Sequence, residues 1–158
     1  PRFFTYRGRL HLSFAFIEPR EDHTTSTQYL IRLGDDYQPE KVWCPRYEHA
    51  NKIEKNWIFF EHGDDLLAIY SISPHVVLKV NGNVAEPYAV SDQLLPWSGG
   101  YLRGGTPVVR VGDEYITFLH GAVDGAGRRT YNVGVYAFEA KPPFRVTRIT
   151  PSPIMWAD

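Results

Sequence analysis

Apolar residues recur at every second position along much of this chain, as they do in strands that bury one face. Residues 3–6, a turn at Arg7-Gly8 and residues 10–16 form the first such unit, which predicts a β-hairpin. The stretch 54–75 repeats it, with two strand-like runs around a Gly-Asp-Asp turn. No window of 11 residues or more has a helical period. The pattern therefore predicts an all-β protein.

The rest of the chain continues this pattern. Asn81-Gly82 is a strong hairpin signal. Pro45 lies within the run 42–47, which is therefore expected to be an edge strand. A polar loop is expected at 18–25 and a flexible loop at 121–129. Strands are expected at 28–33, 42–47, 57–60, 66–69, 76–80, 84–90, 106–111, 115–120, 131–139 and 144–149.

Three turn glycines reveal a longer repeat. Gly8, Gly63 and Gly112 are 55 and 49 residues apart, and seven residues before each one a strand begins. This spacing suits a four-stranded propeller blade, so we expect an all-β β-propeller. Three blades cannot close a ring, and the chain is therefore expected to be part of a propeller of four to eight blades. The expected blades cover residues 1–52, 53–97 and 98–158.

Charge and cysteine content exclude several classes of function. The net charge is −1 and no long run of like charge occurs, so we expect neither a nucleic-acid partner nor a membrane partner. Cys44 is the single cysteine, which permits a reducing compartment, and we expect a cytoplasmic location. The chain opens on Pro1 rather than Met, which favours a processed chain or a piece of a longer one.

Motifs for metal or nucleophile chemistry are missing. The chain has no His pair at metal spacing and no Gly-x-Ser-x-Gly elbow, so no metal site and no serine hydrolase is expected. Aromatic residues make up 15% of the chain and could supply flat surfaces on which sugars stack.

The repeat register brings basic side chains and a histidine together. Lys55 and Arg103 stand just before equivalent strands, and Ser71 and His120 each fall eight residues beyond their turn glycine. With Arg2 they are expected to face one cavity, which would suit phosphate or a carboxylate. The alternatives are that Lys55 is a solvated charge at a strand end and that His120 is a core histidine.

Several of these segments, taken in series, resemble family 130 of the glycoside hydrolases, the β-mannoside phosphorylases and their relatives. The segments are Pro1-Arg2, Glu54-Lys55-Asn56-Trp57, Tyr70-Ser71-Ile72-Ser73-Pro74-His75, Arg103-Gly104-Gly105-Thr106-Pro107, Leu119-His120-Gly121, and Tyr131 with Gly134. The resemblance implies a five-bladed propeller that cleaves a mannoside with inversion, by phosphorolysis or hydrolysis.

The resemblance also implies a role for individual residues. Arg2, Lys55, His120 and Tyr131 would contact phosphate and sugar. The supporting lining would be Asn56, Ser73, His75 and Arg103. In such proteins an Asp is the general acid and an acidic residue precedes the Pro-Arg pair, so the catalytic acid is expected before Pro1, outside this chain.

The remaining expectations concern partners. We expect no cofactor, inorganic phosphate as a co-substrate, and an oligosaccharide or glycoside as substrate. The rest of the propeller would pack against this chain, and an oligomer is compatible with the sequence. The rival hypothesis is a non-catalytic propeller that binds sugar or acts as a scaffold, attached to a glycosyltransferase. The residue upstream of Pro1 would distinguish the enzyme from the non-catalytic propeller, since an Asp or Glu there favours the enzyme.

Overall fold

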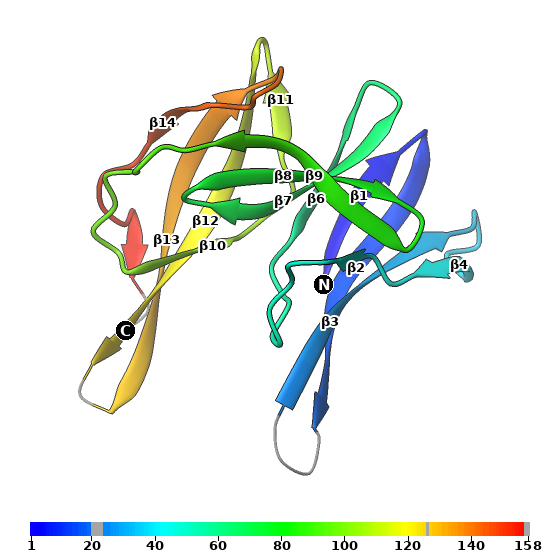
Figure 1. The fold of residues 1–158 in the computed structure, drawn as a ribbon, viewed down its shortest axis with the longest axis horizontal. Helices are drawn as coiled ribbons and strands as arrows, with labels where there is room; N and C mark the ends of the chain where they lie inside the picture. Colours follow the sequence, from blue (N-terminus) through cyan, green and yellow to red (C-terminus); the bar gives the residue numbers. More distant parts are fainter. Residues whose placement is uncertain (20–23, 126, 157–158) are drawn as a thin grey trace.

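The protein consists of β-strands arranged in three sheets (Figure 1). The computed structural model describes residues 1–19, 24–125 and 127–156, and every regular element in this part of the chain is a strand. The prediction of an all-β protein is confirmed. None of the described residues belongs to a helix that could cross a membrane.

The first sheet is an antiparallel meander in chain order. It contains β1 (Arg2–Tyr6), β2 (Arg9–Pro19), β3 (Thr24–Leu33) and β4 (Pro39–Trp43). Gly8 turns the β1–β2 hairpin with φ of 68°, in the left-handed region that glycine adopts at no steric cost. The loop expected at 18–25 is shorter than predicted, because β2 and β3 extend into it. Its centre, residues 20–23, lies outside the described part of the chain.

The second sheet is built from residues 46–91. Its order is β5 (Arg46–Tyr47), β9 (Val84–Ser91), β8 (His75–Asn81), β7 (Asp65–Ile72) and β6 (Ile58–His62). The single strand expected at 42–47 is wrong. Proline has no N–H for a ladder, and the chain leaves the first sheet at Trp43 and pairs with β9 only after Pro45.

The third sheet has β12 (Glu114–Gly125) and β13 (Arg128–Glu139) at its centre. β10 (Tyr101–Gly104) and β11 (Val109–Val111) pair with β12, whereas β14 (Val146–Ile149) and β15 (Met155–Trp156) pair with β13. Of the strand expected at 106–111, only residues 109–111 form one, as β11, and β10 lies before that range in the expected connector. The flexible loop expected at 121–129 is wrong for its described residues, because the β12–β13 ladder continues to Gly125 and Arg128; Ala126 lies outside the described residues.

The second sheet lies between the other two and is covered on both faces. In Figure 1 it is green, with the first sheet (blue) on one side and the third (yellow to red) on the other. Phe59 packs with Phe4 of the first sheet, and Phe60 packs with Phe138 of the third. Burial of both faces explains why the β6 run Ile58-Phe59-Phe60 is continuously apolar instead of alternating.

Two strand contacts connect the second sheet to the other sheets. β1 lies against β6, and β10 lies against β7. This arrangement brings the start of the chain, the segment before β6 and the strand β10 to one place. The candidate site is built there.

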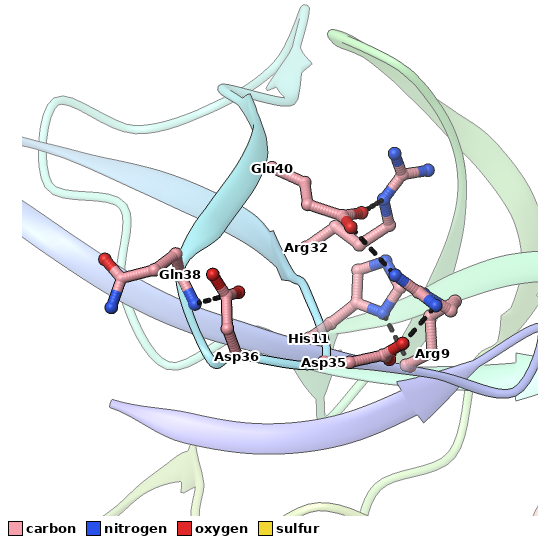
Figure 2. Close-up of polar contacts among 7 residues, drawn as sticks. All are labelled: Arg9, His11, Arg32, Asp35, Asp36, Gln38 and Glu40. Carbon is pink, nitrogen blue, oxygen red and sulfur yellow. Dashed lines mark hydrogen bonds and ion pairs between the residues drawn. The ribbon is translucent and has the colours of Figure 1, made fainter.

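A cluster of charged residues lies elsewhere, around the β3–β4 turn of the first sheet (Figure 2). Glu40 accepts hydrogen bonds from Arg9 at 2.8 Å and Arg32 at 2.9 Å, and Asp35 pairs with Arg9. His11 beside them is buried and stacks between Phe4 and Trp43. These charges neutralise one another, so the cluster is a structural feature of the turn.

Candidate functional site

The segment Glu54-Lys55-Asn56-Trp57 carries the candidate site. The buried carboxylate of Glu54 holds this segment in place. Glu54 accepts hydrogen bonds from Trp57 Nε1 at 2.7 Å, from the Tyr70 hydroxyl at 3.1 Å and from the main-chain N–H of Asn51. Burial and the Glu54 charge raise the pKa of Tyr70 to about 12, so this phenol remains a donor at physiological pH. The segment therefore has little freedom to move.

Replacing Glu54 by alanine should lower the free energy of unfolding by about 2 kcal/mol, because the Trp57 indole and the Tyr70 hydroxyl lose their buried acceptor. Urea unfolding measures this loss. Glu48→Ala is the control, since Glu48 is exposed, and it should change stability by less than about 0.5 kcal/mol. Equal effects of the two variants would contradict the anchoring role.

Asn56 has an unusual backbone that depends on a neighbouring glycine. Its φ is 68°, in the left-handed region that Asn tolerates better than most residues. Its carbonyl oxygen points at Gly104, where a Cβ would collide with that oxygen and come within 2.8 Å of Ile58. Only a glycine at 104 allows β10 to approach the segment this closely.

Arg2 joins all three sheets at this junction. From β1 its guanidinium donates to the carbonyl of Gly104 at 2.8 Å, to the carbonyl of Gly105 and to Asn56 Oδ1 at 3.3 Å. Burial lowers the pKa of Arg2 from its ordinary value. Three of its donors are thus used within the protein, and Arg2 acts first as a structural clamp.

Between this segment and the third sheet lies an open hollow of about 470 Å³, which we call the central hollow. Strand pairing places Arg103 opposite His120, and places Tyr101 and Tyr131 on either side of Ala122. Residues that line the hollow include Lys55, Asn56, Tyr101, Arg103, His120 and Tyr131. Lys55 and His120 therefore share one cavity, as the repeat register predicts.

The charge of the central hollow is mostly positive. Neither Lys55 nor Arg103 pairs with a carboxylate of the described chain. Burial lowers the pKa of His120, and nearby cationic side chains, Arg2 first among them, lower it further. A hydrogen bond from the ring to the Gly104 backbone raises the pKa in part but does not offset these effects. The imidazole is therefore neutral near pH 7, the nitrogen that faces Gly104 carries its proton, and the other ring nitrogen is an acceptor.

One carboxylate is present among the described residues that line the central hollow. Asp124 accepts hydrogen bonds from Arg129 at 2.7 and 3.0 Å, which hold the pKa of this carboxyl below its usual range. It is ionised at neutral pH and is unsuited to donate a proton. The pair adds no net charge, so the excess of positive charge comes from Lys55 and Arg103.

A smaller hollow of about 50 Å³ adjoins the central hollow. Ser71 lines it together with Lys55, Asn56 and Arg103. Ser71 thus lies beside the basic residues, where the register expected it.

Two of the expected lining residues lie elsewhere. His75 is fully buried between the second and third sheets, where its Nδ1 donates to the Phe144 carbonyl at 2.9 Å and its Nε2 lies 3.4 Å from the Tyr136 hydroxyl. Ser73 donates to the Gln93 carbonyl at 3.2 Å. The chain turns back at Ser73-Pro74, so β8 begins at His75 and directs that residue into the core.

Sequence reasoning missed Tyr101, Asp124 and Arg129, all of which line the central hollow. Arg129 had the appearance of a solvated loop residue because the β12–β13 hairpin was expected to end earlier. The signal was the continued alternation His120, Ala122, Asp124, which places these three side chains on one face of β12.

Comparisons of the chain with protein-family models, with curated proteins and with solved structures found no match. The inference of function therefore depends on the geometry and charge of the central hollow.

Proposed function

We propose that the three sheets are consecutive blades of a β-propeller and that the central hollow binds an anion and a sugar in a carbohydrate-active protein resembling the β-mannoside phosphorylases. Support for the blades comes from the strand order, since β1 to β4 follow one another across the first sheet and β6 to β9 across the second. The contact of β1 with β6 agrees with inner strands that gather about an axis.

The observation that carries the proposal is the positive charge of Lys55 and Arg103, which no carboxylate of the described residues pairs, beside the neutral imidazole of His120. Cationic side chains without a carboxylate partner attract an anion, the guanidinium fork matches two oxygens of phosphate, and the second imidazole nitrogen can accept a hydrogen bond from a P–OH group. We therefore infer inorganic phosphate as the anion. Arg2 supports this site by holding Asn56 and the backbone of Gly104 in place.

The tyrosines supply the surfaces for a sugar. Tyr101 and Tyr131 are exposed and lie at the edge of the central hollow, and aromatic rings with a polar tip suit amphipathic ligands such as glycosides. In the phosphorolysis we propose, a phosphate oxygen bonds to the anomeric carbon, the glycosidic C–O bond breaks, and the leaving oxygen takes a proton from a carboxylic acid.

The general acid in this proposal is supplied by a part of the propeller outside this chain. Asp124, the carboxylate found among the described lining residues, is ionised and held by Arg129. The same observation favours the second candidate, a propeller that binds a glycoside without cleaving it. The two candidates share the anion site and differ in whether a bond is broken.

Lys55→Ala and His120→Ala should each weaken binding of inorganic phosphate about tenfold, because Lys55→Ala removes a charge and a donor and His120→Ala removes the acceptor for a phosphate hydroxyl. Titration calorimetry measures the change, and unfolding of the same variants measures stability. Lys141→Ala is the matched control, since Lys141 is exposed on the turn between β13 and β14. Equal losses of phosphate affinity and of stability would contradict a binding role.

Catalysis is tested on the full-length protein with a β-mannoside in the presence and absence of phosphate. Release of mannose 1-phosphate only when phosphate is present would support the phosphorylase. Free mannose without phosphate would indicate hydrolysis, and saturable glycoside binding without turnover would indicate the binding protein.

A further inference from the structure

A second hollow lies on the other side of the segment Glu54-Lys55-Asn56-Trp57. It has a volume of about 440 Å³, and Glu54 and Trp57 line it whereas Lys55 and Asn56 line the central hollow. We call it the side hollow. It is separate from the candidate anion site, and no part of the proposed function uses it.

The side hollow exists because the edge of β3 is only partly covered. β4 pairs with residues 30–33 of β3 and ends at Trp43. The chain returns to this edge at Lys52, where the Ser26 N–H donates to the Lys52 carbonyl at 3.1 Å and the Ser26 carbonyl accepts from Glu54 at 3.0 Å. Gln28 lies between Ser26 and the residues of β3 that pair with β4. Strand alternation turns its main-chain N–H and C=O toward the same edge as those of Ser26.

The side chain of Gln28 is the observation that points to a ligand. Gln28 lines the side hollow and as a residue is 1% exposed, yet neither its Nε2 nor its Oε1 has a hydrogen-bond partner among the described residues. A buried amide without partners is costly and rare in folded proteins. The amide offers a donor and an acceptor side by side, which matches a hydroxyl group because a hydroxyl both donates and accepts.

The rim of the side hollow is polar, and its charges are of both signs. Thr27, Tyr29 and Asn51 contribute hydroxyl and amide groups. Among the described residues that line the hollow, the cations Arg46 and Lys52 are matched in number by the carboxylates Glu18 and Glu54. A rim of this kind favours a neutral ligand with several hydroxyl groups. The volume falls in the range of roughly 300 to 1,000 Å³ that small-molecule sites occupy.

We infer that the side hollow is a second binding site, which takes a neutral polyhydroxyl molecule the size of one sugar ring. Gln28 at its floor binds a hydroxyl group of this ligand through both atoms of its amide. Thr27, Tyr29 and Asn51 at the rim bind others. The site acts independently of phosphate, since the segment 54–57 separates the two hollows.

The test is a titration of the ¹⁵N-labelled chain with D-glucose, D-mannose and D-glucuronate, followed by NMR at the side-chain amides of Gln28 and Asn51. The side-chain amide resonances of Gln28 and Asn51 should both shift saturably with a neutral sugar. Glucuronate should bind no more tightly than glucose, because the charges that line the hollow balance.

Gln28→Leu should weaken sugar binding at least about tenfold and raise Tm of the sugar-free protein by about 3 °C, because it removes a buried amide that lacks partners. Asn51 shifts report the binding in this variant. Gln38→Leu makes the same chemical change at an exposed turn position and should leave the sugar affinity unchanged. Thr27→Val, which removes a rim hydroxyl, should also weaken sugar binding and tests the site again if Gln28→Leu fails to fold.

Three results would overturn the inference. The first is the absence of a saturable shift at Gln28 and Asn51 with any neutral sugar. The second is unchanged sugar affinity in Gln28→Leu, which would mean that a buried water satisfies the amide. The third is tighter binding of glucuronate than of glucose. Lys55→Ala distinguishes the two proposals, since it should reduce phosphate affinity and leave the sugar shifts at Gln28 intact.

Discussion

Replacing Gly104 by alanine should lower the free energy of unfolding by about 3 kcal/mol and should also weaken phosphate binding. The added methyl group would collide with the carbonyl oxygen of Asn56 and with the side chain of Ile58. Backbone cannot give way as a flexible side chain can. β10 would have to move away from the segment before β6, which would separate Arg103 and His120 from Lys55.

Gly125→Ala is the matched control for this prediction. Gly125 is also a strand glycine, but no atom lies within 4 Å of the position its Cβ would occupy. Guanidinium unfolding of both variants should therefore give a loss for Gly104→Ala and a change within about 0.5 kcal/mol for Gly125→Ala. Similar stabilities would show that β10 does not pack as closely on Asn56 as the structure indicates.

Acidification from pH 7 to pH 4 should remove about 3 kcal/mol of stability through His75 alone. Burial between the sheets lowers the pKa of His75 from 6.5 to about 4, against a hydrogen bond to the Phe144 carbonyl that raises it. Between these two pKa values the unfolded chain binds a proton that the folded protein does not. The contribution is therefore complete above pH 6.5 and is lost as the pH falls toward 4.

The measurement is the free energy of unfolding at several pH values for the wild type, His75→Gln and His49→Gln. The pH dependence should be flatter in His75→Gln by about 3 kcal/mol over this range. His49 is exposed and serves as the control, so His49→Gln should keep the wild-type dependence. Burial also lowers the pKa values of His11 and His120, but their contributions cancel in the comparison. Parallel curves for all three proteins would refute the role of His75.

Much of the candidate site could be predicted from the repeat alone. Gly63 and Gly112 turn equivalent hairpins with φ near 60°, and a fixed offset from each glycine gives a fixed position on the strand. Lys55, Arg103, Ser71 and His120 therefore lie around adjoining hollows. Their binding of phosphate stays a prediction.

The errors arose where contacts between sheets outweigh local pattern. His75 follows a motif that looks like site lining, yet its environment is set by Phe144 and Tyr136, more than 60 residues away in the chain. The phosphate contact expected of Arg2 stays a prediction, but nothing in the sequence indicated that three of its donors bind Asn56 and the carbonyls of Gly104 and Gly105. No periodicity within one strand reports such partners.

By itself, the sequence determined most of the strands, most of their hairpin turns and the all-β character of the described residues, because alternation and turn chemistry act between neighbouring residues. Only the tertiary structure decided which polar side chains face solvent, core or hollow. That choice depends on which sheets cover which faces, and so on contacts between residues distant in the chain. Gln28 illustrates the difference, since its strand was predictable but the burial of its amide away from any partner among the described residues was not.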